Sequence, residues 1–235
     1  MIDLGGVDFV INISGIPRDE LEAYSTRLLD DWEAYIGKTL SLSDYSLALD
    51  IEEGSIKGMA RIGVGLSVLY IGIGNYGSFI SGVKTIYGQI SSATEFLSSR
   101  ASAPFPSENK LKVKRNGGSL GQLKKLFIKV QRGKITADQA MVEAEKLFGE
   151  DAKSTPGFMG SLKDSINDTK LFGQQIPLPF PLVDFEQEVF VVEEPSKRQS
   201  VPRPPKPEAP ISHQFRIEIW RESKNEKRKV RVMEL

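Results

Sequence analysis

The sequence contains no cysteine and a single histidine, His213, among its 235 residues. The absence of cysteine excludes disulfides, thiolate nucleophiles and cysteine-ligated metals, and it fits a reducing compartment. One histidine excludes a metal site built from several imidazoles, and we expect His213 to be an ordinary residue at the start of a strand. No catalytic motif was found, so no catalytic, cofactor-binding or metal-binding residue is predicted.

The chain also lacks an excess of charge, because 31 Lys and Arg are balanced by 31 Asp and Glu. No global electrostatic field therefore attracts nucleic acid or anionic lipid. The first residues, MIDLGGVDFVINISG, lack the basic n-region and the uninterrupted apolar h-region of a signal peptide. We therefore expect a cytoplasmic protein.

Charged residues are absent between Arg61 and Lys84, where glycine and serine recur. The interior of this run, Ile62–Val83, is about as long as a bilayer-spanning helix. A helix is predicted over about Gly65–Ser98, kinked near Gly72–Gly77, because each helical glycine costs about 1 kcal/mol. Small residues at spacings of four or seven allow close approach of another backbone and form a candidate contact face: Gly63, Ser67, Gly74, Ser78 and Gly82.

Three interpretations of this helix compete: a core helix buried against the N-terminal sheet, a membrane-inserting segment, and a self-association face. Asn75 argues against the membrane, because an unpartnered amide is costly in hydrocarbon. The small-residue face and the amphipathic continuation favour tight packing in a soluble protein.

The first 98 residues predict a β-α-β-β-α body, and the chain as a whole an α+β fold. Val7–Ile13 alternates like a strand, and Ile56–Ile62 returns as a strand after the extended stretch Thr39–Asp50. Between the first strand and this stretch lies a predicted helix that ends at Gly37. Its buried face has helical spacing: Leu21, Tyr24, Leu28, Trp32 and Tyr35.

Residues 99–118 are predicted to be a linker with a basic cluster of Lys110, Lys112, Lys114 and Arg115. Because the cluster precedes NGGSLGQLKK, a turn followed by the start of a helix, one interpretation is a phosphate or nucleic-acid contact. The sequence does not match a phosphate-binding loop, because no Ser or Thr follows the lysines. We expect a solvated connector and no nucleic-acid partner.

Residues 119–150 predict two short helices around a glycine turn. Thr136 begins the second helix, and Gln139 three residues later completes a capping box. This pattern of an apolar helix, a Gly turn followed by Ile-Thr and a second helix resembles SHOCT-like helical hairpins, although the acidic run of many such modules is missing. The resemblance covers this segment alone and implies an oligomerisation or docking appendage. An ordinary hairpin packed on the body has the same pattern.

The C-terminal part is predicted as an irregular segment with one strand (151–194), a proline-rich linker (195–210) and a β-hairpin (211–235). PxxP spacings involving Pro202, Pro205 and Pro207 provide a candidate partner motif, although a semi-rigid spacer is the commoner meaning. An isolated hairpin is marginally stable, so we expect it to dock on the body or on another chain.

These patterns predict a non-catalytic assembly or adaptor protein that acts through protein contacts or self-association. One alternative is a membrane-associated bacterial effector that inserts Ile62–Val83. An enzyme of unrecognised type is a second alternative.

Overall fold

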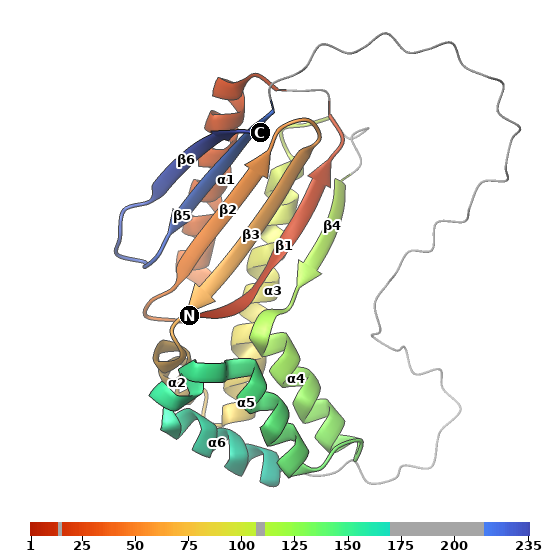
Figure 1. The fold of residues 1–235 in the computed structure, drawn as a ribbon, viewed down its shortest axis with the longest axis vertical. Helices are drawn as coiled ribbons and strands as arrows, with labels where there is room; N and C mark the ends of the chain where they lie inside the picture. The colour runs from red at the N-terminus through yellow and green to blue at the C-terminus, as the bar shows by residue number, and fades with distance from the viewer. Residues whose placement is uncertain (14–15, 107–110, 170–213) are drawn as a thin grey trace, which may run out of the picture. The chain divides into compact units, whose positions relative to one another are not determined.

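A six-stranded antiparallel sheet forms the centre of the fold, with strand order β4-β1-β3-β2-β5-β6 (Figure 1). The computed structural model describes residues 1–13, 16–106, 111–169 and 214–235. They belong to one compact unit, Met1–Leu171 with His213–Leu235; a second unit, Phe172–Ser212, lies outside the described residues. The strands are β1 (Ile2–Ile11), β2 (Ser46–Glu52), β3 (Ile56–Val64), β4 (Leu111–Asn116), β5 (Phe215–Arg221) and β6 (Lys229–Glu234).

Two long helices, α1 (Arg18–Thr39) and α3 (Phe79–Ser102), lie side by side on one face of the sheet (Figure 1). The buried Trp32 indole donates to the Ala93 carbonyl at 3.0 Å, and Tyr35 stacks on Phe96 with 4.2 Å between ring centroids. Alternate residues of the central strands point into this layer, so the other face of the sheet is left open. The remaining helices gather at one end of the sheet: α2 (Leu66–Gly74), α4 (Gly118–Gln131), α5 (Ala137–Ser154) and α6 (Pro156–Asn167).

The predicted α+β class is confirmed. The path β1-α1-β2-β3-α3-β4 with strand order β4-β1-β3-β2 is the split β-α-β connectivity of ferredoxin-like folds. That connectivity hosts many unrelated functions and assigns none by itself.

The C-terminal hairpin is part of the central sheet. β5 pairs with β2, so that Ile217 lies opposite Ile51 and Ile219 opposite Leu49. All four side chains are buried. The hairpin predicted from the sequence is therefore present, and it docks on the body, the first of the two predicted placements.

The uncharged run does not form one helix. It contains the end of β3, then α2, then a turn at residues 75–78, and finally the start of α3, with 111° between the two helices. The break occurs where Gly77 has a φ of +75° and the Ser78 hydroxyl accepts from the Ser81 N–H at 3.2 Å. The predicted kink region was thus correct, but continuity across it was wrong. Within the described residues, no single helix has both the length and the apolarity to cross a bilayer.

The segment predicted as a linker holds the last turn of α3 and the whole of β4. The helical pair at 119–150 is present as α4 and α5, and the capping box of Thr136 and Gln139 has both of its hydrogen bonds. The last turn of α5 and the whole of α6 lie in the segment 151–194, where the sequence predicts a weak helix over Phe158–Leu171. His213, the predicted strand near residues 185–192 and the proline motif of Pro202, Pro205 and Pro207 lie outside the described residues.

Candidate functional site

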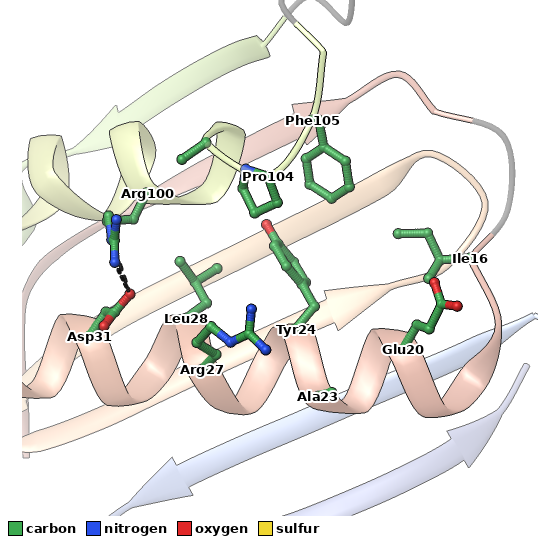
Figure 2. Close-up of a pocket in the computed structure, with 11 residues that line it drawn as sticks. Ile16, Glu20, Ala23, Tyr24, Arg27, Leu28, Asp31, Arg100, Pro104 and Phe105 are labelled. Carbon is green, nitrogen blue, oxygen red and sulfur yellow. Dashed lines mark hydrogen bonds and ion pairs between the residues drawn. The ribbon is translucent and has the colours of Figure 1, made fainter.

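A groove with a volume of about 600 Å³ runs along α1 beneath the C-terminal end of α3 (Figure 2). This volume lies within the range of ligand pockets in proteins. Its lining comes from two sequence regions. The first is α1 with the segment before it, and the second is the end of α3 with the residues that follow: Ile16, Glu20, Ala23, Tyr24, Arg27, Leu28 and Asp31 from the first, and Arg100, Ala103, Pro104 and Phe105 from the second.

The wall of the groove is apolar and aromatic. Tyr24 and Phe105 lie with 5.4 Å between ring centroids, with Leu28 and Pro104 beside them. The Tyr24 hydroxyl donates to the Ala101 carbonyl at 2.9 Å. Burial raises the pKa of this phenol, so it stays protonated at physiological pH. Tyr24 therefore acts as a fixed part of the wall and not as a proton acceptor.

Some charged groups of the groove form an ion pair and others do not, among the described residues. Arg100 donates from Nε and Nη2 to the same Asp31 oxygen, at 3.0 and 2.7 Å. Glu20 and Arg27 have no ion pair within the described part of the chain. The Arg27 guanidinium extends along the groove beside Tyr24 (Figure 2). As far as the described residues show, the groove thus combines an apolar wall with one unpaired cation and one unpaired anion, an arrangement suited to binding.

A second hollow lies between α1 and β5 and is lined by the ion pair of Glu33 and Arg221 that joins them. Arg221 is 7% exposed, and its Nη1 donates to Glu33 on α1. Within the described residues, its Nε and Nη2 are buried without a hydrogen-bond partner, and the Tyr45 ring lies 5.8 Å from the guanidinium. We interpret this cluster as the attachment of the hairpin to α1.

Asp44 provides a further attachment for the same hairpin. Burial raises the pKa of its carboxyl, but hydrogen bonds outweigh that effect and hold the pKa below its ordinary value. The donors are the Lys224 N–H at 2.7 Å, the Ser223 hydroxyl at 2.8 Å and the Tyr45 N–H at 2.8 Å. The positive charge of Arg221 lowers the pKa further. The carboxylate form of Asp44 is therefore favoured by the folded chain.

The five residues of the candidate contact face do not share one surface. Ser67, Gly74 and Ser78 are exposed around the α2–α3 corner, where Gly74 and Ser78 line a third hollow of about 470 Å³. Gly63 lies in β3, and a Cβ on it would meet the Ser46 hydroxyl at 2.5 Å. Gly82 packs on α2, where a Cβ would lie 2.4 Å from the Ile73 carbonyl oxygen. Two of the five predicted residues, Gly63 and Gly82, are therefore taken up by packing within the chain.

The glycines of NGGS allow the turn between β4 and α4 to pass close to the backbone of β1. Gly118 has a φ of +54°, and a Cβ there would lie 2.3 Å from the Leu4 carbonyl carbon. Asp3 approaches the same turn, with one carboxylate oxygen accepting from the Gly5 N–H at 2.8 Å and the other from Asn116 at 3.4 Å. The β1 backbone thus fills the space above this turn, and the turn is not an open cradle for phosphate.

The basic cluster is divided between the two faces of β4. Lys112 and Lys114 lie opposite Val10 and Asp8 on the open face of the sheet, whereas Arg115 is opposite Val7 on the helix side. Lys110 lies outside the described residues. In the described ranges no group of His, Asp and Glu is arranged to hold a metal ion.

The groove was not predicted from the sequence. Tyr24 and Leu28 were assigned to the buried face of the first helix, but their partners Pro104 and Phe105 were assigned to a linker. A helical spacing indicates which residues are apolar neighbours but not where the covering layer ends. Comparison with known proteins gave no match: no family model, no curated protein and no solved structure matches the chain.

Proposed function

We propose that this protein is a non-catalytic adaptor that binds a segment of a partner protein in the groove between α1 and the end of α3. The observation that supports this proposal best is the unpaired Arg27 beside an apolar, aromatic wall. A guanidinium offers a fixed fork of donors to a carboxylate, and aromatic walls accept apolar side chains. The resemblance of α4 and α5 to docking hairpins favours the same class of function.

The spacing of the free charges specifies the partner. Glu20 and Arg27 are seven residues apart on α1, which is two helical turns or about 10 Å along the axis. A peptide in the polyproline II conformation covers about 9 Å in three residues and returns its side chains to the same side every third residue. The expected ligand is therefore a polyproline II segment with one basic and one acidic residue three positions apart, and with apolar side chains between them for the wall of Tyr24 and Phe105.

Selection from a random peptide library displayed on phage, followed by fluorescence anisotropy with synthetic peptides, tests this proposal. Selected peptides should contain the basic–apolar–acidic pattern. The variant R27E should weaken their binding about tenfold through lost attraction and new repulsion. A23W should abolish binding, because Ala23 is exposed on the floor of the groove.

The matched control is A34W, the same substitution at an exposed position of the same helix outside the groove. It should bind like the unmodified chain. Peptides that bind A23W as tightly as A34W would show that the groove is not the site. Enrichment of peptides without acidic residues would show that Arg27 does not specify the ligand.

A further inference from the structure

β4 forms one edge of the sheet, and no described element covers its outer side. It pairs with β1 on one side, and all residues from Lys112 to Asn116 are exposed. In an antiparallel edge strand about half of the backbone N–H and C=O groups point outward without a strand partner. These groups can be satisfied by water or by another extended chain.

The two edges of the sheet differ in how their charges are satisfied. On β6, Lys229 is 2.7 Å from Glu222, and Arg231 is 3.9 Å from Glu218 and lies over the Trp220 ring. On β4, Lys112 and Lys114 have no acidic partner in the ranges that the structure describes.

The acid opposite Lys114 in the sheet is paired with another residue. Asp8 lies directly opposite Lys114, but its carboxylate is 2.6 Å from Arg61, and Lys112 lies opposite the uncharged Val10. Among the described residues, the β4 edge therefore presents two positive charges without an acidic partner.

The side chains of β4 alternate between the two faces, as a partner strand would require. Lys112 and Lys114 project on the open face, and Val113, which is 41% exposed, projects on the other. Arg115 also lies on the helix side, where it is 3.7 Å from an exposed Glu95. Lys112 and Lys114 share the open face, but two cations are few for a nucleic acid, whose binding depends on the neutralisation of several phosphates, whereas an edge strand also offers backbone groups to a peptide.

We propose that the outer edge of β4 binds an extended acidic peptide by strand addition. Backbone hydrogen bonds would continue the sheet beyond β4, as in other peptide complexes of this kind. Acidic residues two positions apart pair with Lys112 and Lys114, and the residue between them packs on Val113. This surface shares no residue with the groove, so the proposal stands or fails independently of the proposed function.

Lysines on an edge strand also have a protective role, because they discourage edge-to-edge aggregation. This role is compatible with the proposal. A second copy of β4 would bring like charges together and is repelled, while an acidic strand is attracted. Lys112 and Lys114 therefore disfavour pairing between two copies of β4 and favour a partner strand of negative charge.

The test uses the full chain labelled with ¹⁵N and an octapeptide in which Glu and Val alternate. Amide resonances of residues 111–116 should shift on titration, and the corresponding Lys-Val octapeptide should leave them unchanged. The double variant K112E/K114E should bind the acidic peptide about tenfold more weakly. The matched control K227E/K229E, a charge reversal of equal size at the β6 end of the sheet, should retain the affinity.

Two further probes separate strand addition from simple charge attraction. Methylation of alternate backbone nitrogens removes donors from the peptide without changing its charge, and should abolish binding. Equal binding by the methylated peptide would overturn the proposal, as would equal loss of affinity in the K227E/K229E control. A (dT)8 oligonucleotide that shifts the same resonances and binds more tightly than the peptide would overturn it in favour of a nucleic-acid surface.

Discussion

The C-terminal hairpin should contribute to the global stability of the chain, and two buried isoleucines on β5 test this. Ile217 and Ile219 are 0% and 1% exposed and pack opposite Ile51 and Leu49. Truncation of a buried isoleucine to alanine costs about 2–5 kcal/mol, through lost burial and the cavity left behind. We expect I217A and I219A each to cost about 3 kcal/mol. Val230 on β6 is 46% exposed, so V230A should cost less than about 1 kcal/mol.

The two tryptophans allow the core and the hairpin to be followed separately. Trp32 is fully buried on α1, and Trp220 lies on β5. In a W220F background, urea unfolding followed by fluorescence reports Trp32 alone. A loss of 3 kcal/mol should lower the midpoint of this transition by about 1 M or more. If I217A leaves the Trp32 transition unchanged while it releases the hairpin, the hairpin is an appendage and the argument from the sheet register is refuted.

Three further predictions concern charge and close packing. E33A should lower the free energy of unfolding, measured in urea, by about 3 kcal/mol, because it leaves Arg221 buried without its counter-ion. R221M removes the buried charge itself and should cost clearly less. Equal costs for the two variants would contradict an ion-pair role. The pKa of Asp44 is lowered in the folded chain, so the stabilisation that its carboxylate provides is present at neutral pH and is lost as the pH falls below 3.8, the ordinary pKa of aspartate. The difference in the free energy of unfolding between D44N and the unmodified chain should therefore be larger at pH 7 than at pH 3. G82A should lower the thermal midpoint, since its methyl group would meet the α2 backbone, whereas G74A, which has open space, should raise it; the reverse order would refute the close packing.

Local signals in the sequence predicted much of the fold. Alternation indicated β1 and β3, helical spacing indicated α1, and the capping box of Thr136 and Gln139 marked the start of α5. In each case the signal lies within a few residues. The α+β class follows from these elements and was correct.

Long-range partners explain what the sequence could not predict. LKVKRN has only two apolar residues, because an edge strand with one exposed face needs little burial, and it pairs with β1 about a hundred residues earlier. The break between α2 and α3 at residues 75–78 depends on the close contact of Gly82 with the α2 backbone. The groove depends on Phe105 reaching Tyr24. None of these contacts leaves a periodic pattern.

The charges on the two edges of the sheet bear on the kind of assembly that the proposed function would require. β4 presents Lys112 and Lys114, which have no acidic partner among the described residues, whereas Lys229 and Arg231 of β6 are paired with Glu222 and Glu218. Pairing of two β4 edges from different copies would bring like charges together, which opposes self-association through this edge. The small residues predicted for self-association are partly consumed in internal packing, as Gly82 is against α2. An acidic partner meets neither obstacle. We therefore propose that the β4 edge takes part in assembly with a different protein and not with a second copy.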